Sequence, residues 1–186
     1  MRIIGGTLRG RKLATVRGSA IRPTADRVRE ALFNILGVRA VTASHVLDLF
    51  AGTGAMGMEA LSRGARQAVF VDRSAAAIAL LRRNLAICRL EACSRVIQWN
   101  IAQNLNPLRA YPRTFDLVFM DPPYGQGLIA PCLERLAACG ALATGAVIVV
   151  EHSPDEALGA PPPGLTRIDF RRYGRTAVTL FLVHEP

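Results

Sequence analysis

VLDLFAGTGAMG, residues 46–57, joins an apolar run to a turn with two glycines and then to a helical pattern. The apolar start is typical of a buried strand, and residues 55–63 are expected to form a helix. Gly52 and Gly54 let the backbone approach a ligand closely, and the start of the helix leaves N–H groups free to bind it. A strand–turn–helix unit of this kind is typical of α/β proteins that bind a nucleotide-like cofactor.

A second apolar strand, residues 68–71, ends in Asp72, which stands twenty residues after Gly52. An acid at this place is suited to two hydrogen bonds with a ribose diol. Residues 52–57 also match the GxGxxG pattern of nicotinamide enzymes, so an NAD-dependent dehydrogenase is one interpretation. Asp48 favours another, because its carboxylate would repel a pyrophosphate but attract, directly or through water, the ammonium of an amino acid. We therefore predict S-adenosylmethionine, whose sulfonium charge makes its methyl group electrophilic without a metal.

The tetrapeptide Asp121-Pro122-Pro123-Tyr124 follows the apolar run 115–120 and indicates methyl transfer to a planar nitrogen. The lone pair of such an amine is delocalised, so a catalyst must accept its two N–H bonds and favour a pyramidal nitrogen. Asp121 and the carbonyl of Pro122 are the predicted acceptors, and Tyr124 is predicted to stack on the base. The two prolines donate no N–H groups, which keeps the carbonyls of the turn free. An ordinary turn after a strand is the alternative interpretation.

Apolar strand patterns alternate with helical patterns along the chain, without an internal repeat. Further strands are expected at residues 95–99, 115–120 and 146–151, and a final antiparallel hairpin at residues 165–173 and 176–183. Ser74 is expected to cap a helix that reaches about residue 90, and a short helix is expected near residues 101–110. We predict a single Rossmann-like α/β domain, with a seven-stranded, mostly parallel sheet that ends in this hairpin. Ligands of such sheets bind beyond the carboxyl ends of the strands, and the acidic or amide residues predicted there are Asp48, Asp72, Asn100 and Asp121.

The net charge of +9 is concentrated at the start of the chain. Residues 1–45 hold nine Arg or Lys against two acids, whereas the remainder is nearly balanced. Residues 3–13 are expected to form a hairpin, followed by a helix with one apolar stripe. We interpret residues 1–40 as an ordered RNA-binding extension beside a catalytic domain of residues 41–186. The predicted RNA-binding residues are Arg9, Arg11, Lys12, Arg22, Arg27, Arg29 and Arg172.

Three stretches carry a resemblance to one enzyme family: MRIIGGTLRGRKL at 1–13, RPTADRVREALFNIL at 22–36, and Arg172-Tyr173-Gly174. Together with the glycine loop and the DPPY loop, they make the chain similar, nearly end to end, to bacterial class I methyltransferases that modify guanine N2 in small-subunit ribosomal RNA, of the guanine-966 type. The resemblance implies methyl transfer from S-adenosylmethionine to one guanine of 16S rRNA, within an assembled or assembling small subunit. It implies that the cofactor is bound by Asp48, Phe50, Gly52, Thr53, Gly54, Asp72 and Asn100, although Asn100 stands where many relatives have an acid.

Three other functions stay open at this point. DNA adenine methyltransferases share the DPPY loop, but the chain leaves no room for a target-recognition domain. Protein glutamine methylation uses a similar loop, usually with Asn in the first place, and needs no basic extension. A non-catalytic RNA-binding or assembly factor would keep the charge without needing Asp121. The residues themselves do not separate guanine N2 from adenine N6, because both amines present two N–H bonds to the same acceptors.

Composition sets further expectations. No apolar stretch approaches the roughly 20 residues of a membrane span and the N-terminus is too polar for a signal peptide, so we expect a cytoplasmic protein, and we expect a monomer. The four cysteines lack zinc-site and redox spacings, so no metal is predicted. Cys132 follows Pro131, as the nucleophile does in pyrimidine C5 methyltransferases, but its apolar neighbours indicate a core position. Glu151-His152 is expected to be a solvated pair at the end of a strand.

Overall fold

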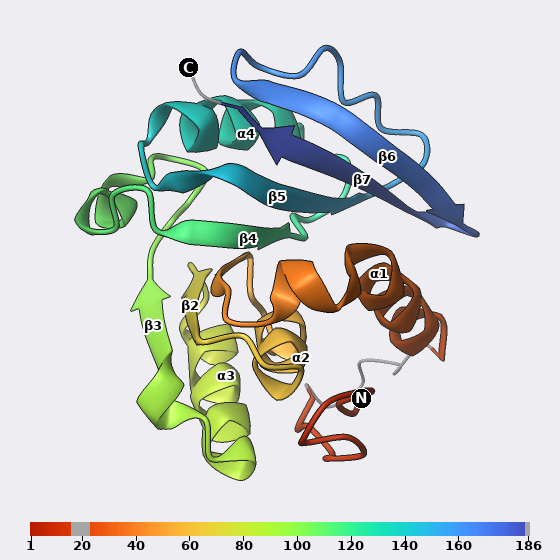
Figure 1. Cartoon of the computed structure of the whole chain (residues 1–186), viewed down its shortest axis with the longest axis vertical. Helices are drawn as coiled ribbons and strands as arrows, with labels where there is room; N and C mark the ends of the chain where they lie inside the picture. The colour runs from red at the N-terminus through yellow and green to blue at the C-terminus, as the bar shows by residue number, and fades with distance from the viewer. Residues whose placement is uncertain (16–22, 185–186) are drawn as a thin grey trace.

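The computed structural model describes residues 1–15 and 23–184, and for residues 23–25 it describes the backbone alone (Figure 1). Helices and strands alternate through most of this length, and no described helix is both long and apolar enough to span a membrane. The elements are α1 (Pro23–Val41), β1 (His45–Leu49), α2 (Ala55–Ser62), β2 (Gln67–Asp72), α3 (Ala75–Cys88), a short 3₁₀ helix (Glu91–Cys93), β3 (Ser94–Gln98), a second 3₁₀ helix (Asn106–Ala110), β4 (Phe115–Met120), α4 (Ile129–Ala138), β5 (Leu142–His152), β6 (Leu165–Tyr173) and β7 (Thr176–Val183).

The strands of the described residues form one seven-stranded sheet in the order β3-β2-β1-β4-β5-β7-β6. The first five of these in space, β3 to β5, pair in parallel, whereas β7 runs antiparallel to β5 and forms a hairpin with β6. The predicted mostly parallel sheet with a final antiparallel hairpin is therefore confirmed. Because β1, β2, β4 and β5 run the same way, their carboxyl ends meet at one edge of the sheet.

Side chains alternate between the two faces of each strand, and in the central strands β1, β2 and β4 both faces are buried. Phe70 and Phe119 belong to the core on one face, which α1, α2 and α3 cover. Val71 and Met120 belong to the core on the other face, which α4 and the 3₁₀ helix Asn106–Ala110 cover. Continuous apolar runs in the sequence of the central strands follow from this burial on both sides. Figure 1 shows α4 on the opposite side of the strands from α1, α2 and α3.

The N-terminal segment folds as the predicted hairpin and packs on the same core as α2 and α3. Arg2 and Lys12 form an antiparallel bridge, and the N–H of Ile3 donates to the Arg11 carbonyl at 3.0 Å. The side chain of Ile3 is fully buried. The helix α1 follows and crosses residue 40, with a kink at Gly37 where φ is 68°. The division of the chain into residues 1–40 and 41–186 stays a prediction, and it falls within a continuous element.

A buried carboxylate joins the hairpin to the helix after the glycine loop. Glu59, on α2, is fully buried and accepts hydrogen bonds from the N–H groups of Ile4 at 2.7 Å and Gly5 at 2.8 Å. The Nε atoms of Arg63 and Arg29 lie 2.8 Å and 3.5 Å from its oxygens. Two backbone donors and two guanidinium groups thus satisfy a charge that would otherwise be costly to bury.

Arg29 is therefore a structural residue, and its predicted contact with RNA is wrong. Only 4% of its side chain is exposed, although it lies outside the apolar stripe of α1. Its guanidinium donates to the carbonyl of Arg2 and to Asp26, besides the ion pair with Glu59. The N-terminal hairpin covers this side of α1, which the periodicity of the helix does not reveal. Arg22, another predicted RNA contact, lies outside the described residues.

Candidate functional site

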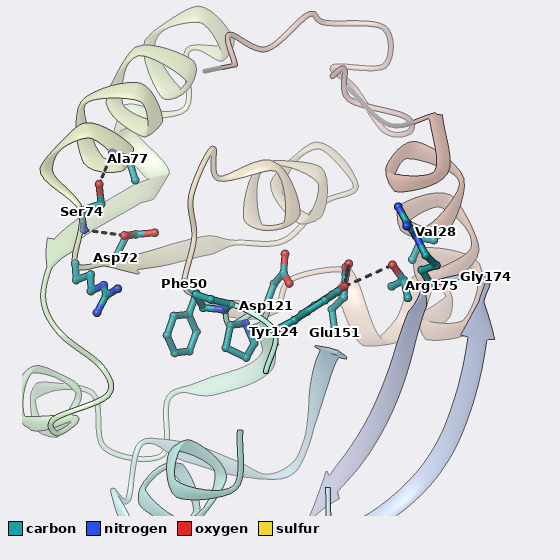
Figure 2. A pocket seen from close by; sticks show the side chains of 14 residues that line it. Val28, Phe50, Asp72, Ser74, Ala77, Asp121, Tyr124, Glu151, Gly174 and Arg175 are labelled. Carbon is teal, nitrogen blue, oxygen red and sulfur yellow. Dashed lines mark hydrogen bonds between the residues drawn. The ribbon is translucent and has the colours of Figure 1, made fainter. Parts of the chain in front are cut away.

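A cavity of about 790 Å³ opens at the carboxyl edge of the sheet (Figure 2). The strand ends of β2, β4 and β5 contribute to it, together with α1 and the turn between β6 and β7. Its lining consists of Val28, Phe50, Asp72, Arg73, Ser74, Ala77, Asp121, Pro122, Pro123, Tyr124, Glu151, Gly174, Arg175 and Thr176. The structure therefore brings together the predicted catalytic loop and two of the predicted cofactor residues, Phe50 and Asp72.

The glycine loop after β1 is held by close packing as well as by backbone geometry. Phe50, Gly52 and Gly54 all have positive φ, and a Cβ on Gly54 would lie 2.2 Å from Cδ1 of Leu81. Gly54 is thus required by the turn and by its contact with α3. Thr53 places its hydroxyl 3.4 Å from the sulfur of Met1, next to the N-terminal hairpin. Gly52, Thr53 and Gly54 do not line the cavity, so their contact with a cofactor stays a prediction.

Asp72 connects the glycine loop to the cavity. Its Oδ2 accepts from the N–H of Gly52 at 2.9 Å, and its Oδ1 accepts from the N–H of Ser74 at 2.8 Å. Ser74 in turn caps α3 by accepting from the N–H of Ala77, as Figure 2 shows. A carboxylate has about four acceptor positions, so each oxygen of Asp72 keeps one for a ligand hydroxyl. This arrangement suits the predicted bidentate contact with a ribose diol.

Asp48 lies beneath the loop and is only 3% exposed. Its Oδ2 accepts from the N–H of Gly57 at 2.9 Å, and a Cβ at Gly57 would lie 2.4 Å from Phe70. Burial raises the pKa of Asp48 to about 7, with a further contribution from the charge of Asp72 and against the hydrogen bond from Gly57. At neutral pH the carboxyl is therefore close to half protonated, and a nearby cation would restore its charge.

This burial makes a prediction for Asp48→Asn. The pKa of Asp48 lies above its ordinary value of 3.8, so the folded protein binds a proton that the unfolded chain releases, and stability falls as pH rises from about 4 to 7. An amide keeps an acceptor for Gly57 but cannot ionise. The difference in free energy of unfolding, Asp48→Asn minus wild type, should be larger at pH 8 than at pH 5 by about 1–4 kcal/mol. Urea unfolding of both proteins measures this; an equal difference at the two pH values would contradict it.

The DPPY loop begins where β4 ends. Asp121 and Tyr124 are exposed to the cavity, whereas Pro122 is buried. The hydroxyl of Tyr124 donates to Oε1 of Glu151 at 3.0 Å and lies 3.5 Å from the hydroxyl of Thr176. Figure 2 shows Asp121, Tyr124 and Glu151 close together, between Asp72 on one side and Arg175 on the other. The loop is therefore fixed to both β5 and β7.

Two acids of the cavity, Asp121 and Glu151, have carboxyl groups whose pKa is raised above the ordinary value. Asp121 faces the cavity, but the surrounding protein excludes much of the water around its carboxyl. This desolvation raises the pKa of the carboxyl, and the charges of Glu151 and Asp48 raise it further. Burial also raises the pKa of Glu151, against the hydrogen bond from Tyr124 and the positive charge of Arg29. Several carboxyl groups close together produce a negative potential, which suits a cationic cofactor and a substrate that presents N–H donors.

The predicted solvated pair Glu151-His152 is a mistake. His152 is only 2% exposed, and its ring nitrogens lie 2.8 Å from the Ser153 carbonyl and 2.9 Å from the Thr179 hydroxyl. Glu151 instead lines the cavity. Sequence reasoning also missed Arg175, Thr176 and Arg73 in the lining. The sequence contained one signal for Glu151, because this acid stands at the end of the predicted strand 146–151, much as Asp121 directly follows the predicted strand 115–120.

The remaining predicted residues lie elsewhere. Asn100 accepts from the N–H of Ala102 through its side chain and does not line the cavity, so its cofactor contact stays a prediction. Arg9 and Arg27 are exposed and meet in a second, smaller cavity. Arg11, Lys12 and Arg172 are also exposed.

The cysteines have no place in this site. Cys132 is 1% exposed, which confirms its predicted core position, and burial raises the pKa of its thiol. Across the described part of the chain, no three His, Cys, Asp or Glu side chains gather as a metal-binding group.

The sheet order, the glycine loop after β1, the acid that ends β2 and the DPPY loop after β4 together define a Rossmann-like fold of the class I methyltransferase type. The chain belongs to the family described as Conserved hypothetical protein 95, whose model matches residues 1–182. The predicted fold and the family resemblance are both confirmed.

Individual relatives cover nearly the whole chain. The chain is 34% identical to the putative rRNA methyltransferase YlbH of Bacillus subtilis, over 97% of this chain and 98% of the relative. It is 38% identical to Ribosomal RNA small subunit methyltransferase D of Escherichia coli, over 97% of this chain and 89% of the relative. A solved structure, the putative methyltransferase yhhF from Escherichia coli, is similar with a TM-score of 0.87 at 36% identity, covering 100% of this chain and 99% of that one.

Proposed function

We propose that this protein transfers the methyl group of S-adenosylmethionine to N2 of one guanine in the 16S rRNA of the small ribosomal subunit. The observation that carries the proposal is the position of Asp121, at the end of β4 and inside the cavity that Asp72 also lines. The relatives named as rRNA methyltransferases, one of them of the small subunit, support the choice of substrate. Such a substrate places the reaction in the cytoplasm, on an assembled or assembling subunit, and we propose that the enzyme acts as a monomer.

The proposed reaction is a single displacement. The carboxylate of Asp121 and the carbonyl of Pro122 accept the two N–H bonds of the amine, which localises the nitrogen lone pair. A bond forms between this nitrogen and the methyl carbon while the bond from carbon to the sulfonium sulfur breaks, and the amine then loses a proton to water. Tyr124, which is 42% exposed and whose hydroxyl donates to Glu151, offers a flat surface for the flipped base.

On the cofactor side, Asp72 is the proposed partner of the ribose diol, because both of its oxygens are oriented by backbone N–H groups at the edge of the cavity. Phe50 lines the same cavity and offers an apolar surface. Asp48 is the proposed partner of the ammonium group, directly or through water, since a positive charge would stabilise its ionised form. Gly52, Thr53, Gly54 and Asn100 complete the proposed cofactor site.

Methyl transfer to defined acceptors tests the proposal. Tritiated S-adenosylmethionine should label naked 16S rRNA or isolated small subunits, and digestion of the labelled RNA should yield N2-methylguanosine. Label in adenine, DNA or protein would replace the proposed substrate with one of the alternatives. If no acceptor is labelled although the protein binds RNA, the protein would instead be a non-catalytic RNA-binding factor.

A charge reversal at Arg9 and Arg27 tests the RNA-binding surface. The two arginines come from the hairpin and from α1 and line one cavity, so Arg9→Glu with Arg27→Glu should remove two phosphate contacts. We expect RNA affinity to fall about tenfold or more and the slope of log affinity against log salt to decrease by about 1.5–2. Filter binding measures both. The matched control is Arg109→Glu, an exposed arginine on the second 3₁₀ helix, and cofactor affinity should be unchanged in all variants. Equal RNA affinity in the double variant and the control would contradict the proposed RNA-binding role of the N-terminal extension.

A further inference from the structure

Glu151 stands beside Asp121 because of the register between β4 and β5. The two strands are parallel and Met120, the last residue of β4, lies opposite Val150, so the residues that follow this pair are Asp121, directly after β4, and Glu151 on β5. Neighbouring strands lie about 4.8 Å apart. Both side chains line the same cavity, and the charge of Glu151 contributes to the raised pKa of Asp121. A second carboxyl group is therefore available next to the one that is proposed to hold the amine.

The side chain of Glu151 is held in place by its surroundings. Its Oε1 accepts from the hydroxyl of Tyr124 at 3.0 Å, which leaves Oε2 available to a ligand in the cavity. The Tyr124 hydroxyl is itself 3.5 Å from the hydroxyl of Thr176 on β7. Burial raises the pKa of Glu151, while the hydrogen bond from Tyr124 and the positive charge of Arg29 oppose this shift and favour the ionised form. The group thus presents a hydrogen-bond acceptor to the cavity.

We propose that Glu151 selects guanine over adenine by accepting the N1–H bond of the target base. This inference rests on the proposed function, because it concerns the base that lies against Asp121 and Pro122. Those two acceptors treat the N2 amine of guanine and the N6 amine of adenine alike. Glu151 supplies the acceptor that distinguishes them, on the strand next to β4.

The discrimination follows from the atoms beside each amine. In guanine the neighbour of the N2 amine is N1–H, a donor, so three donors face the acceptors of Asp121, Pro122 and Glu151. In adenine the neighbour of the N6 amine is an unprotonated N1, whose lone pair would face the carboxylate of Glu151 without a hydrogen between them. A site that leaves a buried polar group unpaired against the wrong substrate rejects that substrate strongly.

The test combines Glu151→Gln with substitution of one base atom. Once labelling has identified the target nucleotide, RNA is prepared by ligation with guanine, 2-aminopurine or 6-thioguanine at that position. 2-Aminopurine keeps the N2 amine but has an unprotonated N1 and no O6, whereas 6-thioguanine keeps N1–H and changes only O6. We expect the wild type to prefer guanine over 2-aminopurine by about 10-fold to 100-fold in kcat/KM, as for a hydrogen bond to a charged group. Because an amide can accept or donate, Glu151→Gln should reduce this preference to within about threefold.

The ratio of the two substrates is the informative quantity, because any inactive fraction of the enzyme cancels from it. Glu134→Gln, an exposed position on α4, is the matched control and should keep the wild-type ratio. Tyr124→Phe removes the hydrogen bond to Glu151 but keeps the carboxylate, so its ratio should stay near that of the wild type although its rate falls. An equal loss of preference in Tyr124→Phe and Glu151→Gln would overturn the inference, since Glu151 would then act only through Tyr124.

Two results separate this inference from the proposed function. If the wild type labels no guanine in RNA, the proposed function fails, and this result does not depend on the base analogues. If guanine is labelled but Glu151→Gln keeps the full preference over 2-aminopurine, the proposed function stands and the role of Glu151 is wrong. A wild-type preference for guanine over 6-thioguanine as large as that over 2-aminopurine would likewise overturn it, by assigning the effect to O6.

Discussion

Asp121→Ala is expected to lower the rate of methyl transfer by about 10³-fold or more, while RNA and cofactor affinities change by less than about threefold. The carboxylate of Asp121 is proposed to accept one of the two N–H bonds of the amine, and that hydrogen bond strengthens as the nitrogen becomes pyramidal. An interaction made mainly in the transition state affects the rate of the chemical step rather than binding. Single-turnover transfer of tritium from S-adenosylmethionine measures this step directly.

The fold should tolerate this substitution. Partial burial and the charges of Glu151 and Asp48 raise the pKa of Asp121, so the ionised carboxylate is destabilising in the folded protein above its ordinary pKa. Removing it should leave the melting temperature at pH 8 unchanged or higher. Asp155→Ala, an exposed acid in the loop after β5, is the control for loss of one negative charge. Single-turnover activity of Asp121→Ala within a few-fold of the control would falsify the catalytic assignment.

Glu59→Ala is expected to destabilise the protein by about 3–5 kcal/mol, because it removes one partner of a buried ion-pair network. The substitution leaves the guanidinium groups of Arg29 and Arg63 without their shared carboxylate, and the N–H groups of Ile4 and Gly5 without an acceptor. All of these groups join the N-terminal hairpin and α1 to α2. The loss should therefore be largest at the N-terminal segment.

Urea unfolding gives the change in free energy, and hydrogen exchange shows where protection is lost. The amide hydrogens of Ile4 and Gly5 should exchange much faster in Glu59→Ala, with a smaller change in the central strands. Glu91→Ala, at an exposed position in the first 3₁₀ helix, should change stability by less than about 0.5 kcal/mol. A loss in Glu59→Ala as small as in this control would mean that the network contributes little net stability.

The sequence pattern predicted the bounds of a strand correctly where the residues of that strand and the adjoining turn determine them. The predicted bounds of β4, residues 115–120, agree with the structure, as do those of the hairpin strands at 165–173 and 176–183. An apolar run that ends in DPPY and an alternating pair around Gly174 each define an element without reference to any neighbour. The capping of α3 by Ser74 is of the same kind.

The predicted boundaries were wrong where contacts or backbone geometry, rather than the local sequence pattern, decide where an element begins or ends. The structure begins β5 at Leu142 rather than at residue 146, because Leu142 pairs with Phe115 across a register shift between β4 and β5. The expected helix at 101–110 is a 3₁₀ helix limited to Asn106–Ala110. The helix α3 stops at Cys88, two residues early, where Arg89 has a φ of 56°.

The sequence by itself determined the chemistry of single strand ends: a glycine loop with Asp48, an acid at residue 72 and the DPPY loop. Each is readable because the residues that act together are adjacent in the chain. Only the tertiary structure decided which distant groups meet. It buried Arg29 against Glu59, through a hairpin that covers one side of α1, and it placed Glu151 beside Asp121 through the pairing of β4 with β5. Burial and register depend on contacts between segments far apart in the chain, and no local pattern encodes them.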